Sequence, residues 1–517
     1  MSLARRGERP RYIIGVDAGT TSVKSVAFGL DGRIASVARS TLRIERGDDE
    51  RAETDMNHVW DAAVTTISAV VEALGDGEVV AIGITGQGDG AWFVDERMQP
   101  LRKAALWLDG RATSRLSAWL VDGRTDAVLQ TTGSPPFAGA LPVLLEELTA
   151  ADPELMSEIA FHLNCKDWLR FKLTGHIATD PSEASRTYLD TTTGEYSAEL
   201  LTALGQEDFA SRLPPIERPE SIGAVLNERA AFAVGLPPGV PVVVGLVDTA
   251  AAGVGLGAIA DDEGFAILGT TGFVGINRAE RGEVARDTSI VLSTGRGSQV
   301  LEALAPMAGT PNLDWVRDSL GLAAEQWPEI EARAAAVPAG SGGVVYLPYG
   351  APSGERAPFF DPAASASWLG MSITTTVPEL LRSVYEGIAY GLTECLDDLG
   401  IRGDLPLCGG GSDSDLLCSI LADVSGRRIV RQDEPEVGAR GVASLAFVAL
   451  GFAADLVEAV ETLAPPSSVF EPDPRHAELY GKGRAAFIAA RDALRPLWPA
   501  LREQRVRSAA IARDRFG

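Results

Sequence analysis

A Gly-Thr-Thr turn between two short apolar runs occurs twice in this chain, at Gly19 and again at Gly269. Each copy predicts a strand, a tight turn and a returning strand. The two copies are separated by nearly half of the 517 residues, which favours internal duplication over chance recurrence of a tripeptide. A chain of this length also exceeds what one hydrophobic core usually holds, so we expect two large domains.

Strands alternating with helical segments accompany each Gly-Thr-Thr turn. In the first half, residues 12–17 and 79–85 predict buried strands, and residues 55–74 between them have helical spacing. In the second half, residues 264–268 predict a strand and residues 377–399 a long amphipathic helix. This alternation is typical of α/β folds, so we expect two α/β domains.

The chain is strongly acidic, which limits its partners. Its formal charge is −25 and its pI about 4.6. An acidic surface repels nucleic acid and anionic lipid, so neither is an expected partner. Residues 1–11 are polar and lack an apolar segment, so no signal peptide is expected. Residues 242–260 are the most apolar stretch, but Asp248 and several glycines favour a buried strand, a loop and a helix over a membrane span.

Cysteine and histidine usage points to a reduced protein without zinc. The four cysteines form no C-x-x-C pair and cannot cross-link a chain of this length, which favours the cytoplasm. The four histidines are scattered, so a zinc site built on them is not expected. A homodimer is compatible with the sequence, which carries no pattern that sets the oligomeric state.

The sequence excludes a Walker loop and matches the dinucleotide-binding fingerprint only weakly. A Walker loop needs Gly-Lys-Ser/Thr, and of the five lysines only Lys482 follows a glycine, with Gly483 after it. Residues 253–258 resemble a dinucleotide-binding fingerprint weakly, because Ala258 stands in the last place. We interpret their small side chains as allowing a helix to pack closely.

The first Gly-Thr-Thr turn carries the groups that a polyphosphate needs. Gly19 lets backbone N–H groups face an anion. Asp17 is placed to hold Mg²⁺ through water, and Lys24 offers a cation. The turn and the start of the next strand add three hydroxyl donors, from Thr20, Thr21 and Ser22. An ordinary hairpin with polar turn residues is the alternative.

The second turn supports that interpretation but is chemically poorer. It consists of Gly269, Thr270, Thr271 and Gly272. These residues offer backbone and hydroxyl donors but no acid or cation. Two such turns can close on one polyphosphate from both sides.

Asp248 is the carboxylate we select as general base. It follows the apolar run 242–247, which predicts a buried strand, and it precedes Thr249 and three alanines. An aspartate in this place is either the base or the N-cap of the next helix.

Residues 86–90 read Gly-Gln-Gly-Asp-Gly and follow a predicted strand. Ligands of α/β proteins bind at the carboxyl ends of strands. Gln87 and Asp89 supply the paired donors and acceptors that sugar hydroxyls require. We therefore select Gln87, Gly88 and Asp89 for substrate binding, with Asp248 and Thr249, while a plain glycine turn remains the alternative.

Taken together, these segments resemble the FGGY family of carbohydrate kinases over most of the chain. The remaining matching segments are residues 107–111, 166–175, 179–185, 245–248, 347–349, 353–358, 409–412 and 421–423. The resemblance implies a duplicated actin-like, ribonuclease-H-like fold of two domains with the active site in a central cleft. The expected ranges are 11–252, 253–465 and a helical tail, 466–517, packed on the second domain.

The resemblance also implies ATP and Mg²⁺, and it assigns roles to individual residues. Asp248 matches the catalytic base, and Asp17 with Asp248 would be the metal-binding carboxylates. The turns at Gly19 and Gly269 match the two phosphate motifs. The adenosine motif is matched by Gly409, Gly410, Gly411 and Ser414. The expected activity is transfer of the ATP γ-phosphate to a hydroxyl of a small sugar or polyol.

The expected substrate depends on residues 87–89. Xylulose kinases usually carry Gln-Met-His there and glycerol kinases an arginine–glutamate pair, whereas this chain has Gln-Gly-Asp. The string resembles erythritol-type polyol kinases more closely, and the charge of Asp89 should disfavour acidic sugars. The alternatives are a catalytically silent sugar-binding regulator of the same fold, an actin-like ATPase or chaperone, and a dehydrogenase that uses residues 253–258.

Overall fold

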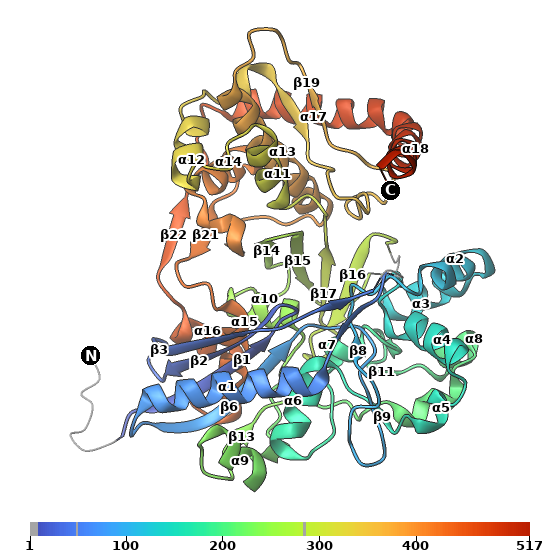
Figure 1. Cartoon of the computed structure of the whole chain (residues 1–517). Helices are drawn as coiled ribbons and strands as arrows, with labels where there is room; N and C mark the ends of the chain where they lie inside the picture. The colour runs from blue at the N-terminus through green and yellow to red at the C-terminus, as the bar shows by residue number, and fades with distance from the viewer. Residues whose placement is uncertain (1–8, 48–49, 283–285, 517) are drawn as a thin grey trace. The chain divides into compact units, whose positions relative to one another are not determined.

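The computed structural model describes residues 9–47, 50–282 and 286–516, so residues 1–8 of the N-terminal segment lie outside it. The chain forms two compact units (Figure 1). The first unit contains residues 1–261, 277–302 and 436–465. The second contains residues 262–276, 303–435 and 466–517. Each unit has its own sheet and hydrophobic core, as expected for two α/β domains.

The first unit is built on a six-stranded sheet with the order β12-β13-β6-β1-β2-β3. Strands β1 (Arg11–Ala18), β2 (Ser22–Gly29) and β3 (Ile34–Thr41) form the expected antiparallel meander. Strand β6 (Glu78–Gly86) runs parallel to β1 on its other side. The short strands β12 (Ala224–Val225) and β13 (Pro241–Val242) complete the sheet.

Helices cover both faces of this sheet because its strands are apolar on both sides. Ile14 and Val16 of β1 pack with α1 (Met56–Leu74), which lies along the strands in Figure 1. Ile13, on the opposite face, packs with α15 (Val437–Ala449). This alternation follows from the two-residue period of a strand. The Asp55 side chain starts α1 by accepting a hydrogen bond from the Asn57 N–H.

The strand expected over residues 242–247 is mostly absent, and this expectation was wrong. Only Pro241–Val242 belongs to β13, although Val247 forms an isolated bridge with Gly86. The reason is Gly245, whose φ of 82° turns the chain. A Cβ at this position would lie 1.8 Å from the Ile84 carbonyl oxygen, so the close approach to β6 requires glycine.

The remaining elements of the first unit are short and lie mainly between residues 100 and 235. The helices are α2 (Thr113–Asp122), α3 (Arg124–Thr132), α4 (Leu141–Ala151), α5 (Leu155–Glu158), α6 (Cys165–Thr174), α7 (Pro181–Ala184), α8 (Ala198–Leu204), α9 (Glu228–Val234), α10 (Asp248–Gly255) and α16 (Leu456–Leu463). The strands are β4 (Glu45–Arg46), β5 (Ala52–Thr54), β7 (Phe93–Val94), β8 (Ala104–Ala105), β9 (Phe161–His162), β10 (Leu189–Asp190), β11 (Glu195–Tyr196) and β16 (Ser289–Ser293).

The second unit contains the second hairpin. Strand β14 (Gly264–Leu268) pairs antiparallel with β15 (Gly272–Arg278) and parallel with β20 (Leu405–Cys408). Strands β21 (Ile429–Gln432) and β22 (Ser467–Phe470) follow β20 in the same sheet. The predicted strand 264–268 and the predicted helix 377–399 are confirmed, the helix as α13.

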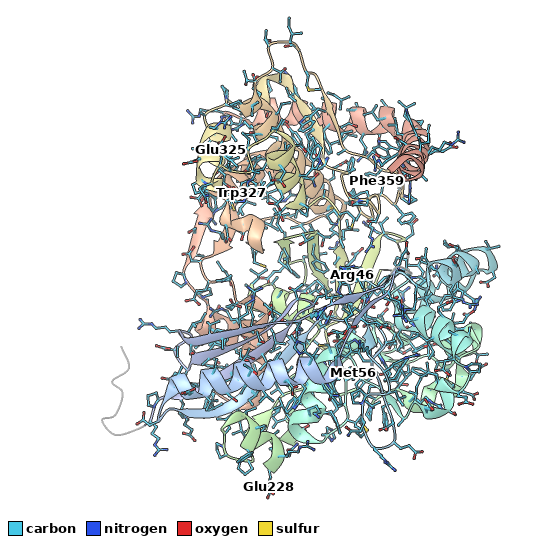
Figure 2. All side chains as sticks on the ribbon, in the orientation of Figure 1. Arg46, Met56, Glu228, Glu325, Trp327 and Phe359 are labelled. Carbon is cyan, nitrogen blue, oxygen red and sulfur yellow. The ribbon has the colours of Figure 1, made fainter. Side chains whose placement is uncertain are left out.

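Helices pack on these strands around one large core. They are α11 (Pro311–Ser319), α12 (Trp327–Ala335), α13 (Val377–Asp398), α14 (Asp415–Ser425), α17 (Ala477–Leu494) and α18 (Trp498–Phe516), with strands β17 (Val300–Leu304), β18 (Val345–Leu347) and β19 (Ser367–Leu369). The tail packs within this unit through Tyr480, Phe487 and Trp498. Trp498 stacks on Phe359, which Figure 2 labels in this unit.

The compact units differ from the sequence ranges 11–252 and 253–465 in three segments, of which the first, residues 253–261, only moves the boundary. Residues 436–465 belong to the first unit because α15 packs directly on β1 and β6. A Cβ on Gly15 would lie 2.2 Å from the Ala439 carbonyl oxygen. Residues 277–302 belong there as well, and the Ser293 N–H donates to the Ser185 hydroxyl at 2.9 Å.

Candidate active site

The carboxyl ends of two parallel strands bring the predicted residues of the first unit together. The register of β1 and β6 pairs Asp17 with Thr85 and Ala18 with Gly86. Gly86 also bridges to Val247, the residue before α10. Asp17, the 87–89 turn and Asp248 therefore leave the sheet at the same edge, where ligands of α/β proteins bind.

Asp248 is the first residue of α10, whose N-cap is Val247, so the N-cap alternative for Asp248 is wrong. Its Oδ1 accepts a hydrogen bond of 2.6 Å from the Thr249 N–H. Loss of surrounding water raises the pKa of Asp248 to about 7, and the charges of Asp17 and Asp89 act in the same direction. The Thr249 N–H partly opposes this rise. A carboxyl that titrates near neutral pH is suited to accept and release a proton.

Asp17 lies opposite Lys24 in the β1–β2 hairpin. Burial raises the pKa of Asp17 to about 6, although Lys24 opposes this effect. The Lys24 Nζ donates to Glu436 Oε2 at 3.1 Å, so the first unit already supplies this cation with one acidic partner. Glu436 could not be found from local sequence, because it lies 412 residues further along the chain.

The hydroxyls of the first hairpin have unequal surroundings. The Trp107 indole N–H donates to the Thr20 hydroxyl at 3.0 Å, which ties the hairpin to residues 107–111. Thr21 is exposed in the turn beside Gly19. Ser22 is only 7% exposed, and it already belongs to β2. Thr20 and Thr21 are therefore better placed for a ligand than Ser22.

The 87–89 turn is rigid and close-packed. A Cβ on Gly88 would lie 2.6 Å from Val247 Cγ2, so only glycine fits there. The backbone of Asp89 adopts the left-handed conformation, with a φ of 61°. Gln87 is 2% exposed, and apart from an interaction with the Cys165 thiol its amide has no hydrogen-bond partner among the described residues. A buried amide with so few partners favours a ligand or water at this point.

Arg186 is a residue of this site that the sequence analysis missed. Its Nε donates to Asp89 Oδ1 at 3.2 Å and to Oδ2 at 3.1 Å. Burial raises the pKa of Asp89, and Arg186 opposes the rise. Asp89 is thus one half of an ion pair, so its charge is balanced by that of Arg186. Arg186 comes directly after the motif at 179–185, but nothing in the local sequence links it to Asp89, 97 residues earlier.

A buried ion network supports the turn from α6 and α7. The Lys166 Nζ lies 2.6 Å from Asp167 Oδ1 and 2.9 Å from Asp180 Oδ1, and all three side chains are fully buried. Burial raises the pKa of Glu183 well above its ordinary value. Glu183 Oε2 would lie 3.2 Å from a Cβ on Gly88, so this network reaches the turn itself.

The predicted nucleotide residues of the second unit also gather at one point. A Cβ on Gly409 would lie 2.5 Å from the Leu268 carbonyl oxygen, and one on Gly411 would meet the Leu268 side chain. Leu268 immediately precedes the 269–272 turn. The glycines at 409–411 and the second hairpin are therefore neighbours within this unit.

Several donors of this second cluster are already used. The Gly269 N–H donates to the Thr271 carbonyl, and the Gly272 N–H to the Pro306 carbonyl. No protein partner for the N–H of Thr270 or Thr271 is found in the part of the chain that the structure describes. The Ser414 hydroxyl caps α14 by accepting from the Leu417 N–H at 3.1 Å. Gly410 has nothing within 4 Å of a Cβ, so it borders open space.

The carboxylates of the first unit fit a hard divalent cation. Asp17 raises the pKa of Asp248 by its charge, and a cation between such carboxylates would relieve this repulsion. Within residues 9–47, 50–282 and 286–516, no group of three or more His, Cys, Asp or Glu side chains is arranged around a metal position. Two carboxylates suffice for Mg²⁺, which keeps several waters and takes other ligands from phosphates.

The small residues at 253–258 allow close helix packing, as we predicted from the sequence. A Cβ on Gly255 would lie 1.9 Å from the Val437 carbonyl oxygen of α15. None of the helices in the described ranges is long and apolar enough to cross a bilayer.

Comparisons with known proteins cover nearly the whole chain. Residues 12–255 match the N-terminal domain of the FGGY family of carbohydrate kinases, and residues 264–450 match its C-terminal domain. An erythritol kinase of Brucella abortus is 31% identical over 96% of this chain and 98% of its own length. A xylulose kinase of Escherichia coli is 30% identical over 94% of this chain and 99% of its own.

A solved structure confirms the fold class. The crystal structure of gluconate kinase from Lactobacillus acidophilus has a TM-score of 0.88 and 25% sequence identity. The comparison covers 95% of this chain and all of that one. The names of these three proteins refer to a polyol, a ketose and a sugar acid.

Proposed function

We propose a substrate class and a catalytic base for this chain, which belongs to the FGGY family of carbohydrate kinases and is an ATP-dependent sugar kinase. The substrate is a small neutral polyol such as erythritol, or a pentulose such as xylulose. The similarity to an erythritol kinase over nearly the whole of both chains supports this choice, as does the Gly-Gln-Gly-Asp-Gly string at residues 86–90. We also propose a cytoplasmic location, since all four cysteines are free and buried.

Asp248 acts as the general base in this proposal. The observation that carries it is the place of Asp248 at the carboxyl edge of the sheet, beside the 87–89 turn and Asp17. Its pKa of about 7 lets the carboxylate accept the proton of an attacking hydroxyl and release it again near neutral pH. The hydrogen bond from the Thr249 N–H fixes Oδ1.

The other residues bind and position the sugar, Mg²⁺ and the phosphates of ATP. Gln87 and Asp89, with the backbone at Gly88 and the nearby Thr249, hold the substrate hydroxyls. Asp17, with Asp248, would hold Mg²⁺, which supplies neutralisation of the phosphate charge when bound. The turn at residues 19–22 takes the transferred phosphate end of ATP, with Lys24 nearby. Phosphoryl transfer relies on such positioning and charge neutralisation rather than on covalent help from the protein.

The nucleotide is assigned mainly to the second unit. The N–H groups of Thr270 and Thr271 are available for phosphate oxygens, and the open backbone at Gly410 leaves room for the adenosine. Gly409 and Gly411 shape this surface by their packing on Leu268, and Ser414 starts α14. The N-terminus of that helix adds partial positive charge.

A coupled ADP-release assay tests the proposed substrate class. The panel contains tetritols, pentuloses, glycerol, hexuloses and sugar acids, and product mass identifies the phosphorylated sugar. We expect kcat/KM to be highest for a tetritol or a pentulose. Preference for a sugar acid or for glycerol would refute the substrate class. Binding of a polyol without ADP release would favour the sugar-binding regulator instead.

A further inference from the structure

The guanidinium of Arg186 is held in one orientation beside the 87–89 turn. Its Nε donates to both carboxylate oxygens of Asp89, at 3.2 and 3.1 Å. Its Cζ lies 5.5 Å from the centre of the Phe137 ring, which supports the guanidinium from a second side. The Arg186 side chain is 9% exposed and that of Asp89 15%. A cation held this way loses little further freedom when it binds a ligand.

Most of the donors of Arg186 remain unused. A guanidinium carries five N–H bonds, and Nε supplies only one of them. In the described ranges neither Nη1 nor Nη2 donates to a protein group. Neither is among the fully buried nitrogens that lack partners, so both keep accessible surface. Arg186 thus presents a fork of donors from an otherwise buried position.

The fork lies next to the groups that our proposal gives to substrate and catalysis. Asp89 belongs to the 87–89 turn, and its charge contributes to the raised pKa of Asp248. The buried Gln87 amide, two residues before Asp89, has no partner among the described residues apart from the Cys165 thiol. The 87–89 turn and the Arg186 side chain paired with it therefore both carry hydrogen-bonding capacity that protein groups leave unused.

We propose that Arg186 is a substrate-binding residue that sets specificity, donating from Nη1 and Nη2 to two adjacent hydroxyl oxygens of a neutral polyol or ketose. This inference rests on the proposed function, because it assumes that the sugar occupies the 87–89 turn. A guanidinium fork matches two neighbouring oxygens. Asp89 balances the charge of Arg186, so the pair as a whole favours a neutral diol over a carboxylate.

Substitution of Arg186 tests the contact directly. In Arg186→Met, KM for the best neutral substrate should rise roughly 10- to 100-fold while kcat changes less than about threefold, because a ground-state contact is lost. Arg186→Lys keeps the charge but not the fork, so it should recover only part of this loss. The matched control is Arg115→Met, which removes another ion-paired arginine of the first unit, on α2. Unchanged KM in Arg186→Met would overturn the proposal.

A deoxy substrate separates a direct contact from a structural role. Erythritol and the analogue that lacks one terminal hydroxyl are compared by calorimetry on wild type and on Arg186→Met. Wild type should bind erythritol at least roughly tenfold more tightly than the analogue, and the variant should bind both alike. Equal discrimination by both proteins would overturn the contact. If erythritol does not bind wild type, the best neutral substrate of the ADP-release panel and its deoxy analogue take its place.

Asp89→Asn tests the charge balance of the pair. The variant leaves the Arg186 charge uncompensated, so it should bind erythronate roughly tenfold more tightly than wild type does. An unchanged ratio of erythronate to erythritol affinity would overturn this part. Because calorimetry needs no turnover, sugar binding without ADP release would refute the kinase proposal alone. Normal turnover with unchanged KM in Arg186→Met would refute the Arg186 proposal alone.

Discussion

Gly255 of α10 and Gly441 of α15 lie against each other where the two helices cross. A Cβ on Gly255 would lie 1.9 Å from the Val437 carbonyl oxygen, and one on Gly441 would lie 1.9 Å from the Ala251 carbonyl oxygen. Since Asp248 begins α10, this contact fixes the position of the proposed base against a helix that comes nearly 200 residues later.

Gly441→Ala should therefore lower both stability and activity. The added methyl group must push the two helices apart, at a cost of about 1–3 kcal/mol typical of overpacked cores. We expect a lower urea midpoint and a reduced kcat, because α10 shifts with Asp248. Gly481→Ala is the matched control, since a Cβ there has nothing within 4 Å. Wild-type stability in Gly441→Ala would contradict the close contact.

The pH dependence of the reaction should follow Asp248. A base must be ionised to accept a proton, and the pKa of Asp248 lies at about 7 because of burial and the neighbouring acids. The kcat/KM for the sugar should fall as pH drops below about 7, with a slope that approaches one proton. Bound Mg²⁺ would move this midpoint to lower pH. A flat profile down to about pH 5 would contradict the assignment.

Because its pKa is raised, the ionised Asp248 carboxylate should lower the free energy of unfolding at high pH. Its pKa is raised in the folded protein above the ordinary value of 3.8, so its stabilising protonation is complete below that value and is lost as pH rises through about 7. Asp248→Asn should be more stable than wild type by about 1–3 kcal/mol at alkaline pH, and this difference should shrink toward about pH 4.

Urea unfolding of both proteins in chelator at several pH values measures this difference. Asp76→Asn, which makes the same substitution at an exposed position, is the matched control. A constant difference between Asp248→Asn and wild type at all pH values would show that the Asp248 carboxyl does not titrate near neutral pH.

Lys166 should be among the least replaceable residues of the first unit. Lys166→Met leaves the buried carboxylates of Asp167 and Asp180 without their cation. Breaking a buried ion pair in this way costs about 3–5 kcal/mol. Urea midpoints should show this loss, and it should be smaller at acidic pH, because burial raises the pKa of Asp180 and favours its neutral form. Lys482→Met, which removes an exposed pair with Glu478, serves as the control, and a similar small effect in both variants would contradict the network.

Local patterns explain how much of this molecule could be predicted. The hairpins at Gly19 and Gly269 depend on turn chemistry and on apolar residues within a few positions, so the sequence predicted them correctly. The extent of the strand after Val242 depends on Gly245, whose positive φ serves contact with Ile84. Such a contact cannot be seen in a local pattern.

The site showed the same division between local and distant features. Asp17 and Asp248 could be selected because each lies beside a short, strongly apolar run. Arg186 was missed because its partner Asp89 is 97 residues away. The packing of α15 in the first unit was not predicted. Its small residues, such as Gly441, indicate close packing but do not show which helix they pack against.

The proposed chemistry depends most on the Asp248 carboxylate, which Asp248→Asn replaces with an amide of the same shape. The decisive measurement is the rate of sugar-dependent ADP release by this variant at saturating ATP and sugar, with sugar and nucleotide affinities measured separately by calorimetry. If Asp248 is the base, kcat should fall at least roughly 100-fold while both affinities stay within about threefold of wild type. A variant that keeps wild-type kcat would show that another group accepts the proton.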